Sequence, residues 1–309
     1  MNDFIEKKNS GWQSLIILLL LTFACSLGIQ FIVMLLGFFT GGVDISGNQD
    51  SVRSMLDSRF FTSALLAASS FGTFYLPAVF LQKRESYYEY FPTYHLDKYL
   101  FYVLAVVLLV VFAPLMEVIG DWNASMKLPS YLKGIEQWMR EQEDTMAVLT
   151  KKMVMVDNVW FLLLNIVVMA VLPAIAEEYY FRGSLMHIIG RLVKNHHLAI
   201  WITAFIFSAI HVQFFGFFLR LILGAFFGYM LVWTKNVWVP ILAHFVNNAL
   251  VTILAYYYTK QGKSFEDLQV MSDYPIFVYI GSLLLTIGVI VLFVKNSKEE
   301  KYSNGERLG

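Results

Sequence analysis

The chain has 309 residues, of which 58% are hydrophobic and 15% are charged, and its mean hydropathy is +0.59. Its 23 basic and 23 acidic residues cancel, and no basic stripe interleaved with aromatic residues is present, which argues against a nucleic acid as partner. Cys25 is the single cysteine, so an intramolecular disulfide and a cysteine-based metal site are excluded. Apolar runs of about 20 residues recur along most of the length, which predicts an all-α, polytopic protein of the lipid bilayer.

Eight apolar runs predict a bundle of about eight transmembrane helices. In chain order they are 12–40, 60–81, 99–120, 158–181, 198–215, 217–233, 237–258 and 274–294. The first run is too long for the core of a signal peptide and lacks a clean cleavage site after it, so we expect a retained helix. The fifth and sixth runs are separated by little more than Gly216, which predicts a tight helical hairpin.

The longest polar stretch, 121–157, connects the third and fourth runs. Apolar residues recur among the charges of 135–155, which predicts an amphipathic helix that lies on the membrane or caps the bundle. We therefore expect three regions. They are three spans and this connector (1–157), a core of four spans (158–258), and the last span with a charged tail (259–309).

The distribution of Lys and Arg predicts that both termini are cytoplasmic. With eight spans, the side that holds both termini carries 13 of these residues and the other side carries nine. Five of the nine lie in the long connector, where charge is a weak topology signal. We expect an integral membrane protein, which would lie in the plasma (inner) membrane if the source is bacterial.

An ionisable cluster ends the fourth run, where residues 173–182 read PAIAEEYYFR. Glu178 and Arg182 are four residues apart on one helix face, so we expect them to form an ion pair. Glu177 is rotated from Glu178 by about 100° and lacks that partner, which makes it a candidate general base. Pro173 lies four residues before Glu177 and is expected to kink the helix just ahead of the cluster.

Two other runs carry polar side chains that need partners in lipid. His211 follows Phe207 by one turn in the fifth run, and His244 and Asn248 share one face of the seventh. Such groups find partners by converging inside the bundle. In a bundle of straight helices, however, His211 and Glu177 would lie at depths in the membrane that differ by several ångströms. A carboxylate with a histidine can activate water, and a second histidine with a carboxamide can stabilise an oxyanion. The set favours amide hydrolysis by direct attack of water.

Three ordered motifs resemble those of the CPBP intramembrane endopeptidases, which include CAAX prenyl proteases and bacterial bacteriocin-processing or immunity proteins. The motifs are Glu177-Glu178-x-x-x-Arg182, Phe207-x-x-x-His211 and His244-x-x-x-Asn248, and the resemblance covers residues 158–258. It implies that Glu177 activates water with help from His211, and that His244 and Asn248 stabilise the oxyanion. Glu178 and Arg182 would hold the helix end, and the substrate would be a membrane-associated peptide or protein.

Two questions stay open at this level. The metal-free reaction needs only the residues above, whereas zinc would use Glu177, His211 and His244 and keep one open position. The competing class is a non-catalytic membrane protein, either transporter-like or an immunity or partner-binding pseudo-protease. The Glu-Glu motif has no second copy, which argues against the internal repeats of a transporter.

Two features of the sixth run have structural interpretations. Gly224-x-x-x-Gly228 predicts a face of close helix packing. Arg220 is expected to snorkel toward the interface. The oligomeric state and the chemistry of the substrate, including prenylation, are left open.

Overall fold

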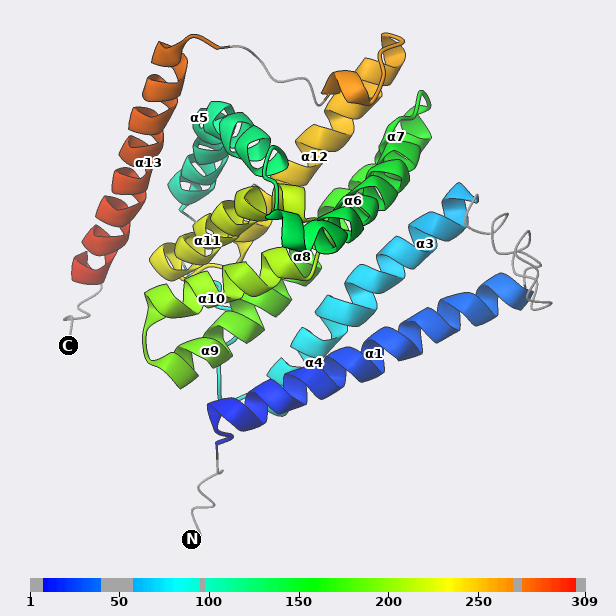
Figure 1. Cartoon of the computed structure of the whole chain (residues 1–309). Coiled ribbons are helices and arrows are strands. Elements are labelled where there is room, and N and C mark those ends of the chain that lie inside the picture. Colours follow the sequence, from blue (N-terminus) through cyan, green and yellow to red (C-terminus); the bar gives the residue numbers. More distant parts are fainter. Residues whose placement is uncertain (1–7, 40–57, 95–97, 269–273, 304–309) are drawn as a thin grey trace, which may run out of the picture.

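The computed structural model describes residues 8–39, 58–94, 98–268 and 274–303, and within these ranges the chain forms helices and no strands (Figure 1). The expected all-α bundle is thereby confirmed. Most of the predicted loop 41–59 and the last residues of the charged tail lie outside the described ranges.

Among the described residues, seven helices are long and apolar enough to cross a membrane, as expected for an integral membrane protein. Their ranges are Gly11–Phe39, Arg59–Arg84, Tyr99–Ala124, Val159–Val193, Phe214–Thr234, Trp238–Lys260 and Ile276–Ser297. They correspond to α1, α3–α4, α5, α7–α9, η5–α11, α12 and most of α13 (Ile276–Ser303). In Figure 1 the beginning of α1 and the end of α13 lie toward the same end of the bundle.

The fifth predicted run is shorter than expected. It forms α10 (His196–Ala209), which is apolar but has only 14 residues, or about 21 Å of helix against a hydrocarbon core of about 30 Å. Asn195 caps its start by accepting from Leu198 N. Its end is set by a turn at Val212, whose φ is +54°. The predicted hairpin with α11 (Phe217–Thr234) is present, but its first arm stops short of a full membrane crossing.

The fourth predicted span is longer than expected. It continues past Phe181 to Val193 and consists of α7 (Val159–Asn165), η3 (Ile166–Val171), α8 (Leu172–Glu177), η4 (Glu178–Leu185) and α9 (Met186–Val193). The helix does not end at Arg182 because that guanidinium is paired with Glu178 and is 1% exposed. Glu177 therefore lies near the middle of this helix, and not near its end as the shorter predicted span implied.

The backbone of this long helix departs from α-helical geometry on both sides of α8. The segments η3 and η4 are π-helical, and η3 ends just before the Leu172-Pro173 pair that begins α8. Proline lacks the N–H that continues an α-helix, and π-helical turns, which are rare overall, occur frequently at functional sites. The same arrangement occurs where π-helical η1 (Ser70–Tyr75) meets Leu76-Pro77 at the start of α4 (Leu76–Arg84).

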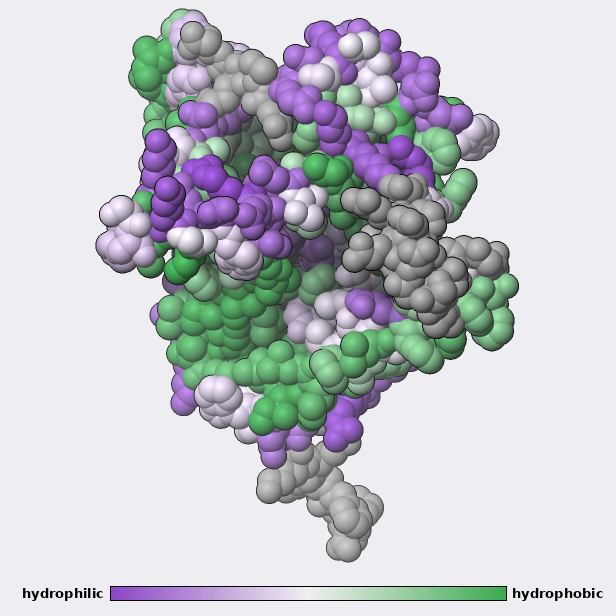
Figure 2. Space-filling model, turned by 45° about the vertical axis from the view of Figure 1, so that its right-hand side comes forward, coloured by the Kyte–Doolittle hydropathy of each residue, from purple (hydrophilic) through white to green (hydrophobic). Residues whose placement is uncertain are grey.

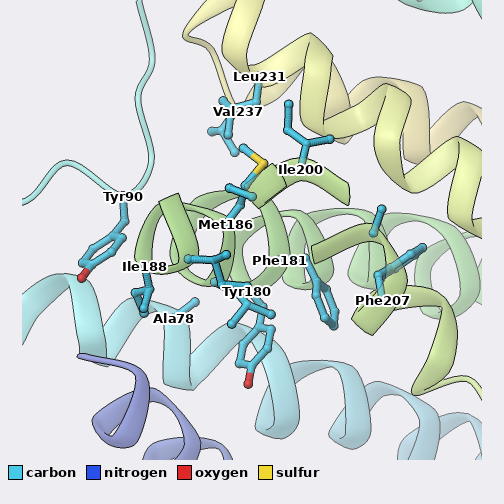
Figure 3. Packing of buried hydrophobic residues seen from close by; sticks show 14 of the residues in the cluster. Ala78, Tyr90, Tyr180, Phe181, Met186, Ile188, Ile200, Phe207, Leu231 and Val237 are labelled. Carbon is cyan, nitrogen blue, oxygen red and sulfur yellow. The ribbon is translucent and has the colours of Figure 1, made fainter. Parts of the chain in front are cut away.

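Two apolar clusters hold the bundle together. One joins α1, α4, η4, α9 and α10, and Figure 3 shows Phe181 of η4 beside Phe207 of α10, with their ring centroids 5.2 Å apart. The other joins α5, α11, α12 and α13. In lipid, helices associate through close van der Waals contact and not through exclusion of water. The two clusters meet around η4 and α11, where the polar residues are buried.

The predicted connector helix is confirmed as α6 (Lys133–Val154), and α6 is tied to neighbouring segments. Arg59 at the start of α3 (Arg59–Ser69) donates to Met153 O over 2.8 Å, and Lys151 pairs with Glu266 at 2.7 Å. Figure 2 shows hydrophilic residues gathered at one end of the molecule above a broad hydrophobic belt. A helical bundle in a bilayer exposes apolar side chains to lipid and keeps polar side chains at the aqueous ends, as seen here.

Candidate active site

The site lies where the α8–η4 junction meets α10, α11 and α12 (Trp238–Lys260). Glu177 is the last residue of α8 and Glu178 the first of η4, so the two carboxylates leave the same helix in different directions. Both are buried, with residue exposures of 9% and 0%. The ion pair expected between Glu178 and Arg182 is confirmed, with Arg182 Nη1 2.8 Å from Glu178 Oε1.

His244 of α12 binds the same carboxylate oxygen. Its Nδ1 lies 2.8 Å from Glu178 Oε1, and the imidazole is buried. Paired with Arg182, Glu178 is a carboxylate and can only accept hydrogen bonds, so Nδ1 of His244 must carry the proton of this contact. The other ring nitrogen, Nε2, is thereby directed to a different partner.

That partner is Glu177. Nε2 of His244 is 3.9 Å from Oε2 of Glu177. This separation is too long for a direct hydrogen bond, whose donor–acceptor distance is about 2.7–3.2 Å. Two polar groups at such a distance can be bridged by one water molecule. Glu178 thus orients the imidazole, while Glu177 stays free of a direct hydrogen bond to it.

Aromatic rings enclose the charged groups. The Arg182 guanidinium lies over Phe207 at 4.4 Å and over Phe227 at 5.3 Å from the ring centroids. Phe227 stacks on His244 at 5.4 Å, and Phe207 meets the same imidazole edge-on at 6.1 Å. Cation–π contacts stabilise a cation that has lost its water, so these rings help Arg182 to remain buried.

His211 and Asn248 lie at the edges of this cluster. His211 follows α10, with Nδ1 2.7 Å from Phe207 O and its ring 4.9 Å from that of Phe207. Asn248 is one turn after His244 on α12 and donates to Met169 O in η3 over 3.2 Å. Phe207 therefore lies between the two histidines, and Asn248 ties α12 to the π-helical segment that precedes α8.

Some members of the cluster were not expected from the sequence. Phe227 contacts both Arg182 and His244, and the carbonyl of Gly224 accepts from Arg182 Nη2 at 3.2 Å. The sequence feature that pointed to this part of α11 was the pair of small residues Gly224-x-x-x-Gly228. The expectation of close packing there is confirmed, because a Cβ at Gly228 would lie 2.9 Å from Ile200 Cγ2.

Arg220 directs its guanidinium toward the loop that precedes α11. Its Nη1 donates to Gln213 Oε1 over 3.1 Å, and its Nη2 donates to the Gln213 carbonyl. The guanidinium turns back along α11 toward the loop after α10, because backbone and side-chain acceptors are available there.

The three residues considered for zinc do not form a ligand set. Within the described ranges, no three His, Cys, Asp or Glu side chains are close enough together to hold a metal ion. Glu177 and His244 face one another, whereas His211 lies at the edge of the cluster, where its ring contacts Phe207. The arrangement fits a carboxylate–imidazole pair with a buried ion pair behind it.

The fold and this cluster define a class of protein, an all-α membrane bundle with a buried glutamate–histidine site in its core. Residues 159–250 match the family model described as "Type II CAAX prenyl endopeptidase Rce1-like". The family resemblance is therefore confirmed over the residues that carry the three motifs. No solved structure matches the chain.

Two proteins of Bacillus subtilis (strain 168) are similar to part of the chain. "Uncharacterized protein YpbD" is 32% identical over 90 residues, which cover 28% of this chain and 43% of that protein. "Putative membrane peptidase YdiL" is 32% identical over 117 residues, which cover 37% of this chain and 44% of that protein. The chain thus matches less than half the length of either relative.

Proposed function

We propose that the protein is an intramembrane endopeptidase that hydrolyses a peptide bond of a membrane-associated protein or peptide. The observation that carries the proposal is the 3.9 Å separation between Glu177 Oε2 and His244 Nε2, with Nδ1 of the same imidazole bound to Glu178. A water bound between these groups touches a base on one side and an imidazole on the other. The family match and the relative named as a membrane peptidase support the same class of reaction.

The charges of the cluster support a protonated His244. Glu177 and Glu178 carry two negative charges, and Arg182 and an imidazolium at His244 balance them. A neutral group of four costs less to bury than one with a net charge. Nε2 of the imidazolium then carries a hydrogen that can be donated to a developing oxyanion.

The reaction follows from these positions. Glu177 takes a proton from the water as its oxygen attacks the carbonyl carbon of the scissile peptide bond. The Nε2–H of His244 donates to the oxyanion that forms. Glu177 then returns the proton to the leaving nitrogen as the C–N bond breaks. In this proposal His211 Nε2 assists Glu177, and the second N–H of Asn248 helps to bind the oxyanion.

An apolar groove next to the site supports delivery of the substrate from the membrane. It has a volume of about 420 Å³ and lies between α8, α12 and the start of α5 (Tyr99–Ala124), lined by Tyr102, Val171, Ala174, Ile175, Trp238, Ile241, Leu242 and Phe245. Ala174 and Ile175 precede Glu177 by less than one turn, and Ile241 and Phe245 flank His244. An apolar segment of a substrate in this groove would lie beside both groups.

The test compares the termini of membrane proteins in cells that express the wild type, Glu177→Gln, His244→Ala or a control. Glu141→Gln, an exposed residue of α6, is the control. We expect a set of new termini in the wild type and the control that both site variants lack. Identical termini in all four strains would overturn the proposal.

A further inference from the structure

The turn that follows α10 has a strained backbone. Val212 has a φ of +54°, a region that β-branched residues rarely adopt. Such a conformation is unfavourable and persists only where surrounding contacts hold it. Val212 directly follows His211, so the contacts that hold this turn also set the position of the imidazole.

Arg220 supplies one set of these contacts from α11. Its two terminal nitrogens donate to Gln213, one to the side-chain oxygen at 3.1 Å and one to the main-chain carbonyl. A guanidinium presents a planar fork of donors that fits two acceptors at once, which a lysine cannot reproduce. The two donors of Arg220 therefore fix the position of Gln213, the residue after Val212.

Gly216 makes room for the clamp. A Cβ at this position would lie 3.0 Å from Arg220 Nη1 and 3.2 Å from Nη2, so the guanidinium rests against the bare backbone of the turn. On the far side of the loop, Asn123 of α5 holds Phe214 O at 2.9 Å and Phe218 N at 2.8 Å. The loop is thus fixed at both ends, with Arg220 at the end nearer His211.

The imidazole of His211 is oriented by the same region. Nδ1 lies 2.7 Å from the Phe207 carbonyl, which only accepts, so Nδ1 carries the hydrogen and Nε2 is left as the nitrogen that can act on a neighbouring group. The Phe207 ring meets both His211 and His244. A shift of the turn would move Nε2 relative to the Glu177–His244 pair.

We propose that Arg220 is a positioning residue, which holds the strained turn at Val212 and thereby places His211 in the site. The inference rests on the proposed function for its effect on catalysis. A misplacement of about 1 Å in such a group can lower a rate about 100-fold. Its effect on the position of His211 can be measured independently of any activity.

The experiment uses the full chain with Arg220→Ala, Arg220→Lys and a matched control, Arg59→Ala. Arg59 is also a part-buried arginine that donates to a main-chain carbonyl, that of Met153. The first readout is the rate at which Glu177-dependent termini appear in cells, corrected for the amount of folded protein. The second is the imidazole NMR signal of His211 in ¹³C-histidine-labelled protein, assigned with His211→Gln.

We expect Arg220→Ala to lower the corrected rate about 100-fold and to shift the His211 signal, with Arg220→Lys between it and the wild type. Arg59→Ala should change neither readout beyond its effect on folding. An unchanged His211 signal in Arg220→Ala would overturn the inference, as would a rate that falls only in proportion to folded protein. If the proposed function is wrong, Glu177→Gln leaves the termini of membrane proteins unchanged. The His211 imidazole signal of Arg220→Ala still tests whether Arg220 positions His211.

Discussion

Nδ1 of His244 and Nη1 of Arg182 each lie 2.8 Å from the same oxygen of Glu178. One carboxylate thus orients an imidazole from α12 and neutralises a guanidinium one turn along its own helix. Glu177, the neighbour of Glu178, is left to face the other side of the imidazole at 3.9 Å. The two adjacent glutamates therefore make different contacts, and the following predictions test whether their roles also differ.

Glu177→Gln should lower the rate of cleavage sharply and cost less stability than loss of Glu178. Loss of a general base typically lowers a rate about 10²–10⁴-fold. The side chain makes no direct hydrogen bond to His244 but balances one charge of the buried cluster, so we expect its loss to cost less than the roughly 3–5 kcal/mol of breaking a buried pair. Denaturation of the variant in detergent, beside the wild type, provides the measurement. A loss of stability as large as that of Glu178→Leu would contradict this assignment.

Glu178→Leu should be strongly destabilising, because it leaves the buried Arg182 without its counter-charge. Removing one partner of a buried pair costs about 3–5 kcal/mol, whereas removing both can be nearly neutral. We therefore expect the double variant with Arg182→Met to be more stable than either single variant. A thermodynamic cycle over the four proteins measures the coupling. Additive effects of the two substitutions would show that the pair contributes no coupling.

Gly224→Ala should disturb the site through the packing of α10 against α11. The new Cβ would lie 3.3 Å from Ala204 Cβ, from Arg182 Nη2 and from Phe207 Cδ1, so the helices must separate slightly. We expect a loss of about 1–3 kcal/mol of stability, typical of overpacking. Gly288→Ala in α13 is the matched control, because nothing lies within 4 Å of its Cβ. Thermal unfolding of both variants tests the difference, and equal shifts would refute the packing argument.

Phe227→Leu should remove the ring contacts to Arg182 and His244 while filling most of the same space. A buried cation–π contact contributes roughly 0.5–2 kcal/mol, and we expect a loss in that range. Phe226→Leu, the adjacent α11 ring that packs edge-on with Phe112, is a suitable control. The His244 imidazole signal should shift in the first variant and stay in place in the second. A His244 signal unmoved by Phe227→Leu would exclude this ring as a positioning contact.

Chelation should leave the cleavage rate of the purified protein unchanged, because the proposed reaction uses only Glu177, the histidines and Asn248. The measurement is the rate with and without a zinc chelator, followed by zinc readdition. A loss that zinc restores would contradict the metal-free assignment.

Several features were predictable because they depend on local spacing. The ion pair of Glu178 with Arg182 follows from positions four residues apart on one helix, and the π-helical backbone preserves the contact. The amphipathic α6 follows from its mixture of apolar and charged residues. The extent of α10 and the continuation of the long helix to Val193 were not predictable, because burial of Arg182 among aromatic rings is a tertiary effect.

By itself, the sequence determined that the chain is a helical membrane bundle and which polar residues it must bury, since lipid offers such groups no other partners. Only the tertiary structure decided how these residues divide their contacts. It directed His244 Nδ1 to Glu178, left Glu177 facing Nε2, and turned Arg220 back to the strained turn beside His211. These choices depend on helix rotation and on π-helical turns. Both are set by packing between segments far apart in the chain, which no local spacing encodes.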